Sequence, residues 1–140
     1  MAFNIKGELK KEQSVEYPRP LTDPMQVIEL SNQDIAIACQ TKVLIADPIT
    51  FKKKKILSND NGRIDALCEH PGGFLIGGSE DYSVAIWDIR NAYCFVRKMS
   101  ASQEIYNLVS WDKILFSSGG GSVSKVILWH ATNFSVLSET

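Results

Sequence analysis

The sequence predicts an all-β fold, and three observations carry that prediction. From residue 25 onward, short apolar or alternating runs of roughly four to eight residues follow one another. Clusters of turn-forming residues separate these runs, for example at 59–62, 71–73 and 119–122. No stretch of helical length carries apolar residues at the i, i+3, i+4, i+7 spacing of an amphipathic helix. Many short β-branched and aromatic runs between regular turns are typical of strands.

The runs also repeat with a nearly constant period. Residues 42–47 (KVLIAD) align with 83–88 (SVAIWD) and with 125–130 (KVILWH). The step is 41 residues from position 46 to 87 and 42 residues from 87 to 129. A period of about 40–45 residues with four strands per unit indicates a β-propeller, whose blades bury their faces by stacking around an axis. We therefore expect a partial β-propeller of about three four-stranded antiparallel blades.

The period divides the chain into a leading segment and three units. Residues 1–24 are rich in Lys and Glu and then carry three prolines, so we expect an extended segment, with a strand near 3–9 as an option. We expect the three blades, within 25–140, at about 25–57, 62–99 and 104–140. In the middle blade we expect strands near 64–69, 74–79, 83–88 and 93–99.

The middle unit is similar to the consensus of the WD-repeat (WD40) family. Residues 75–88, LIGGSEDYSVAIWD, match that consensus almost position by position. The resemblance implies that Asp81 fixes the turn between the second and third strands by accepting local hydrogen bonds. It also implies that Trp87 and Trp129 pack into the blade interior, and that Asp88 completes the Trp-Asp pair.

The buried network typical of this family is incomplete here. In the family, a His before the innermost strand joins the Asp, the Trp and a hydroxyl. No His stands before the middle or the third unit. The first unit has Ala46 and Gln40 where the Trp and the Asp would stand, and the third has Gly121 in place of the Asp. An incomplete buried network stabilises a blade less than a complete one.

The resemblance implies a non-catalytic protein-interaction scaffold. The turns before the innermost strands and between the second and third strands are expected to form one rim. Arg63 and Tyr82 are the candidate protein-binding residues there, since Arg and Tyr are favoured interface anchors. Closed propellers typically have 4–8 blades. We therefore expect further blades, a partner protein or self-association to complete the ring.

Residues 75–90 suggest one alternative function. They resemble the box through which some WD-repeat proteins bind the adaptor of cullin-RING ubiquitin ligases. Arg90 is the informative position, because a guanidinium can form paired hydrogen bonds with a carboxylate. The box overlaps the repeat consensus, so a regular repeat ending in Arg explains the same residues. A substrate-receptor subunit stays open as an alternative.

No catalytic, metal or cofactor site is expected. Cys68 and His70 lie two residues apart, and we expect a packed thiol beside an exposed imidazole. The chain has two His and no Cys-x-x-Cys, whereas a zinc site needs about four ligands at suitable spacing. The Gly-rich residues 119–125 lack the order of a phosphate-binding loop. A propeller-type enzyme is the least favoured alternative.

Composition indicates the surroundings of the protein. The formal net charge is −1, and no apolar run approaches the length of a membrane helix. We expect neither nucleic-acid binding nor membrane insertion. The basic run at 52–55 is expected to protect the outermost strand of the first unit. Three widely spaced cysteines favour reduced thiols in an intracellular, cytoplasmic protein, with the nucleus also open.

Overall fold

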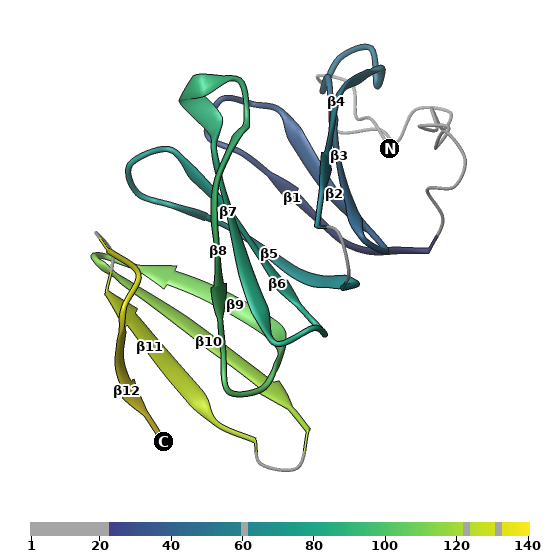
Figure 1. Cartoon of the computed structure of the whole chain (residues 1–140). Helices are drawn as coiled ribbons and strands as arrows, with labels where there is room; N and C mark the ends of the chain where they lie inside the picture. The colour runs from purple at the N-terminus through teal and green to yellow at the C-terminus, as the bar shows by residue number, and fades with distance from the viewer. Residues whose placement is uncertain (1–22, 60–61, 122–123, 131–132) are drawn as a thin grey trace, which may run out of the picture.

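The computed structural model describes residues 23–59, 62–121, 124–130 and 133–140. They form three four-stranded antiparallel sheets that stack against one another as blades of a partial β-propeller (Figure 1). The strand considered near residues 3–9 lies outside the described residues. Among the described residues, no helix is long and apolar enough to cross a membrane.

Each sheet pairs its strands in chain order and is called a blade from here on. Blade 1 contains β1 (Pro24–Glu29), β2 (Ile35–Cys39), β3 (Lys42–Ala46) and β4 (Lys53–Ser58). Blade 2 contains β5 (Ile64–His70), β6 (Phe74–Ser79), β7 (Ser83–Asp88), the short 3-10 helix η1 (Ile89–Asn91) and β8 (Cys94–Ser100). Blade 3 contains β9 (Glu104–Trp111), β10 (Ile114–Gly120), β11 (Val126–His130) and β12 (Val136–Glu139).

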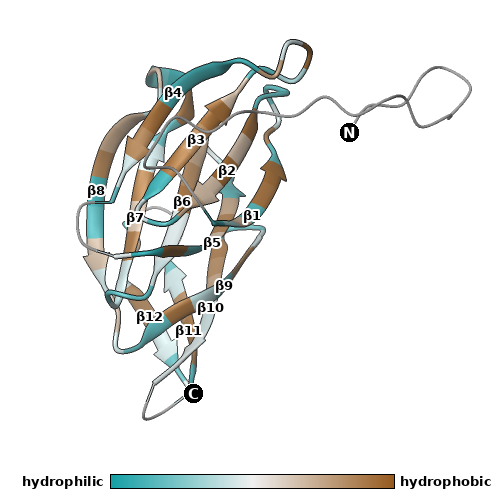
Figure 2. Ribbon diagram, turned by 90° about the vertical axis from the view of Figure 1, so that its right-hand side faces the viewer, coloured by the Kyte–Doolittle hydropathy of each residue, from teal (hydrophilic) through white to brown (hydrophobic). Residues whose placement is uncertain are grey.

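Two apolar cores join the blades because strand side chains alternate between the two faces of each sheet. The core between blades 1 and 2 includes Ala36, Val43, Ile45, Ile64, Leu67, Leu75 and Trp87. The core between blades 2 and 3 includes Ala66, Ile76, Ile86, Ile105, Leu115, Ile127 and Trp129. Figure 2 shows these apolar stretches in brown along the strands. Each blade is thus stabilised mainly by its neighbours.

The two tryptophans of the repeat occupy equivalent places. Trp87 lies on β7 opposite Leu75, and Trp129 lies on β11 opposite Leu115. Their side chains are almost fully buried, and each belongs to the core shared with the preceding blade. The repeat therefore corresponds to a structural unit.

The first strand of each blade is the innermost one. Strand β5 lies against β1 on one side and against β9 on the other. Strand β6 also lies close to β9, and Gly78 of β6 permits this approach because a Cβ atom there would lie 2.3 Å from Cγ2 of Ile105. The fourth strands are outermost, and all four lysines of the run at 52–55 are exposed, as expected for protection of an edge.

Candidate functional site

On one rim of the stack, Arg63 lies beside the β6–β7 turn that carries Tyr82. The backbone N–H of Glu80 donates to the carbonyl of Arg63, at 3.0 Å. The Arg63 guanidinium forms ion pairs with Asp65, at 2.6 Å, and with Glu80, at 3.7 Å. The Asp65 carboxylate raises the pKa of Arg63. Two carboxylates therefore already engage the charge of this predicted anchor.

Tyr82 presents its ring to solvent on the same rim. It is 46% exposed and has a φ of 63°. Its carbonyl accepts a hydrogen bond from the N–H of Ala101, which fixes the turn. Tyr106, at the start of blade 3, is 42% exposed. Exposed tyrosines of this kind are suited to protein contacts because they combine apolar area with a hydroxyl.

Asp81 ties the tight turn between β6 and β7 to the outermost strand β8. Its carboxylate accepts from the Ser83 hydroxyl and from Nζ of Lys98, the latter at 2.6 Å. Burial raises the pKa of Asp81, but the bonds from Lys98, Ser83 and Ser79 outweigh burial and the pKa is lowered. The carboxylate thus stays ionised as a structural acceptor.

The other repeat positions also have local bonding roles. Nε1 of Trp129 donates to the Ser117 hydroxyl at 2.8 Å, which gives blade 3 part of the network seen in the family. Asp88 caps η1, and its Oδ1 accepts from the N–H of Arg90 at 3.1 Å. Asp88 therefore positions the backbone that carries Arg90.

The opposite rim holds a buried network that sequence reasoning missed. The Tyr93 hydroxyl of blade 2 donates to Oδ2 of Asp34 of blade 1, at 2.6 Å. Asn32 donates to both groups, and Nζ of Lys54 lies 2.7 Å from Oδ1 of Asp34. Asp34 is only 4% exposed. Burial raises the pKa of Asp34, but Lys54, Tyr93 and Asn32 together bring it below its usual value.

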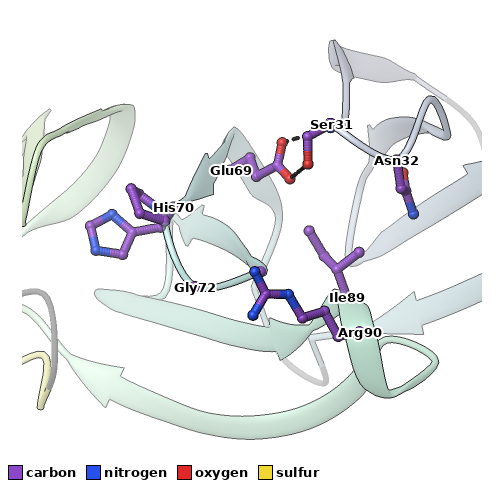
Figure 3. Close-up of a pocket in the computed structure, with 9 residues that line it drawn as sticks. Ser31, Asn32, Glu69, His70, Gly72, Ile89 and Arg90 are labelled. Carbon is purple, nitrogen blue, oxygen red and sulfur yellow. Dashed lines mark hydrogen bonds between the residues drawn. The ribbon is translucent and has the colours of Figure 1, made fainter.

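A hollow of about 590 Å³ opens on this opposite rim, at the junction of blades 1 and 2. The β1–β2 turn, the β5–β6 turn and η1 surround it, and Figure 3 shows its lining. Glu69 accepts at both carboxylate oxygens from Ser31, at 2.8 Å from the N–H and 2.6 Å from the hydroxyl. Arg90 and Ile89 form another part of the lining. We call this site the junction hollow.

His70 corrects one expectation from the sequence. Its imidazole was expected to be exposed, but the residue is only 1% exposed. Nδ1 lies 2.6 Å from the Ser110 hydroxyl, and the ring centroid lies 5.7 Å from that of Phe134. Nε2 has no hydrogen-bond partner among the described residues. Blade 3 covers the ring, and burial lowers the pKa of His70.

Cys68, on the same strand, is a packed thiol as expected. It is half-buried and packs against the core between blades 2 and 3. Burial, with a smaller contribution from Glu69, raises the pKa of Cys68 to about 12. A thiol with such a pKa is a poor nucleophile at neutral pH. Among the described residues, no group of three or more His, Cys, Asp or Glu is placed to hold a metal ion.

The segment 75–90 is mostly interior to blade 2. Leu75, Ile76, Ile86 and Trp87 are 0–2% exposed, so the blade core accounts for the apolar part of the box. Arg90, at its end, is exposed and lines the junction hollow. The three predicted protein-binding residues thus lie on two rims: Arg63 and Tyr82 on one, and Arg90 on the other.

Comparison with known proteins identifies the class of fold. No protein-family model and no curated protein sequence matches the chain. Solved structures do match. The structure of U3-55K matches 89% of this chain with a TM-score of 0.76 and 11% identity, and the WD40 repeats of RRP9 match 88% with a TM-score of 0.75 and 11% identity. The protein therefore has the fold of a WD40-type β-propeller segment.

The chain covers only part of each similar structure. It spans 40% of the U3-55K chain and 39% of the RRP9 chain. A third similar structure, Kuenenia stuttgartiensis hydrazine synthase, has a TM-score of 0.77 and 14% identity, with 93% of this chain and 39% of that chain covered. At these identities the likeness defines the fold, and this chain corresponds to about two fifths of the chains it matches.

Proposed function

We propose that this chain is a non-catalytic WD-repeat interaction scaffold whose propeller is completed by further blades or by a partner chain. The observation that supports this proposal most strongly is the exposed face of blade 3 that points away from blade 2. We call it the open face, and it is formed by Val109, Trp111, Ile114, Phe116, Val126 and Leu128. Val109 is 58% exposed and Trp111 is 68% exposed. Exposed apolar patches of this kind typically mark interaction surfaces.

Comparison between the blades supports this proposal. Strand register places Val109, Phe116 and Leu128 side by side on the open face of blade 3. The same register places Cys68, Ile76 and Ile86 side by side in blade 2. In blade 2, Ile76 and Ile86 are 0% exposed because blade 3 packs on them.

Trp111 of blade 3 can be compared with His70 of blade 2 in the same way. It follows Ser110 at the end of β9, and His70 holds the corresponding place at the end of β5. His70 is 1% exposed, whereas Trp111 is 68% exposed. Covering an aliphatic or Phe side chain stabilises by roughly 1.5–3 kcal/mol. A further blade on this face would therefore gain substantial apolar burial.

The charged groups placed by the structure support a scaffold over an enzyme. Asp34, Asp81 and Glu69 are each bonded to groups that fix turns or join blades. Three free cysteines also accord with a reducing compartment, and we propose the cytoplasm. The ubiquitin-ligase alternative depends on Arg90, and loss of an adaptor on Arg90→Ala is its direct test.

The scaffold proposal is tested through the open face. A tagged chain is expressed in its natural cells, and the mass of the particle it enters is measured by light scattering for the wild type, Val109→Lys and Val96→Lys. Val96 is the matched control because it is also exposed, at 45%, but lies on the outermost strand β8. We expect Val109→Lys alone to reduce the particle to the mass of the tagged monomer. Equal particle masses for all three would contradict the proposal.

A further inference from the structure

We propose that the junction hollow binds an acidic side chain from an extended segment of a partner protein, with Arg90 as the anchor. This inference rests on the proposed scaffold function and names a second, separate surface for it. The open face of blade 3 would complete the ring, whereas the junction hollow would recognise a peptide on the rim.

The backbone that carries Arg90 is held before any ligand arrives. The N–H of Ile89 donates to the carbonyl of Gly73 at 2.8 Å, and the N–H of Arg90 donates to Oδ1 of Asp88 at 3.1 Å. Helix η1 ends at Asn91, and Ala92 caps it in the left-handed conformation with a φ of 51°. A fixed backbone lowers the entropy lost when a ligand binds.

The stem of Arg90 is also positioned. It lies against Gly73, where a Cβ atom would be 2.8 Å from Nε and 2.9 Å from Cγ of Arg90. Gly73 also has a φ of 84°, a conformation that side chains disfavour. The absence of a side chain at this turn therefore gives the guanidinium its place beside the hollow.

Arg90 is the charged group of the junction hollow that is available to a ligand. Both oxygens of Glu69 already accept from Ser31, and the His70 ring is buried toward blade 3. In Figure 3, the His70 ring points away from Arg90 and Ile89. Among the described residues, no hydrogen bond or ion pair engages the Arg90 guanidinium. A guanidinium with free donors binds carboxylates in paired geometry.

The shape of the junction hollow favours a peptide over a small anion. A single exposed ion pair contributes little in water, so a lone carboxylate on Arg90 would bind weakly. The hollow is about 590 Å³ and includes the apolar side chains of Ile89 and Pro71. A segment with Asp or Glu beside an aliphatic residue would contact both the guanidinium and this apolar lining.

The test is a selection from a phage-displayed library of random decapeptides on the purified full-length chain. Wild type, Arg90→Ala and Lys113→Ala are compared. Lys113 is the control because it is also an exposed cation, but it lies in the β9–β10 turn of blade 3 and does not line the junction hollow. We expect wild type and Lys113→Ala to enrich Asp or Glu next to an aliphatic residue, and Arg90→Ala to lose this enrichment. The best peptide should bind Arg90→Ala at least about tenfold more weakly.

Two further measurements complete the test. First, a version of the best peptide with Asn or Gln in place of its Asp or Glu should bind wild type as weakly as the acidic peptide binds Arg90→Ala. Second, thermal unfolding should show that Arg90→Ala is folded. An equal enrichment on Arg90→Ala, or no acidic enrichment on wild type, overturns the inference. Neither result affects the particle mass in the Val109→Lys experiment, so failure here is distinct from failure of the scaffold proposal.

Discussion

His70 places a titratable group inside the core between blades 2 and 3. Its ring contacts Ser110 and Phe134, and Cζ of Arg97 lies over the Phe134 ring, 5.6 Å from its centroid. These neighbours include a cation and no carboxylate, so a protonated His70 would find no counter-charge there. The neutral imidazole is the form that the folded protein accommodates.

This environment predicts a loss of stability in mild acid. Because burial lowers the pKa of His70, the unfolded chain binds a proton more readily than the folded one. The stabilisation is present above the ordinary His pKa of about 6.5 and declines as the pH falls below it. We expect the melting temperature to fall between pH 7.5 and 5.5, and to fall less in His70→Phe. An equal fall in His70→Phe would refute this role.

The hydroxyl of Tyr93 is a second residue whose removal has a defined cost. Tyr93→Phe leaves the buried Asp34 carboxylate without its 2.6 Å hydrogen bond. A hydrogen bond to a charged group contributes about 1.5–3 kcal/mol, so the free energy of unfolding should fall by about that amount although Asn32 and Lys54 still bond to Asp34. Urea denaturation measures it. Tyr106→Phe, at an exposed tyrosine, should change the free energy by under about 0.5 kcal/mol. Similar losses in the two variants would speak against a buried network.

Sequence reasoning identified single residues where the signal is local. Asp81, Trp87 and Trp129 are read from positions within one repeat. The Tyr93–Asp34 bond joins residues 59 positions apart, and only the stacking of two blades brings them together. His70 was expected to be exposed for the same reason: Phe134, which packs against it, lies in the next blade.

At the level of elements, the strand bounds of the middle blade agree closely with those expected from the turn-forming residues. In the middle blade, strands were expected near 64–69, 74–79, 83–88 and 93–99. The structure has β5 at 64–70, β6 at 74–79, β7 at 83–88 and β8 at 94–100. Gly, Asn and Asp clusters end strands through their backbone preferences, which is why these bounds can be read from sequence. The closeness of neighbouring blades cannot be read in this way.

The close contact of β6 with β9 predicts that a larger side chain at Gly78 destabilises the fold. Gly78→Val would add a side chain at a position where even its Cβ atom would lie 2.3 Å from Cγ2 of Ile105. We expect the blades to separate locally, with a loss of about 1–3 kcal/mol in urea denaturation. Ser118 pairs with Val126 as Gly78 pairs with Val84, but on the open face. Ser118→Val should therefore leave the isolated chain nearly unchanged. A neutral Gly78→Val would contradict the described packing.

At the level of the whole molecule, the three blades form a stack in which one face of blade 3 is exposed. The repeat period predicted the three blades, because it depends on residues inside this chain. The surface that we propose to cover Val109 and Trp111 could not be predicted, since it would belong to residues outside the three blades. The chain covers 39–40% of the WD40-type structures it matches.

The most direct test of this account is the native mass of the particle that contains the chain in its natural cells. We expect the particle to have a mass well above 15.6 kDa. In that particle, the fluorescence of Trp111 should be shielded from acrylamide quenching, whereas acrylamide should quench it in the purified chain alone. A particle of 15.6 kDa that unfolds cooperatively, with Trp111 as accessible as in the purified chain, would contradict it.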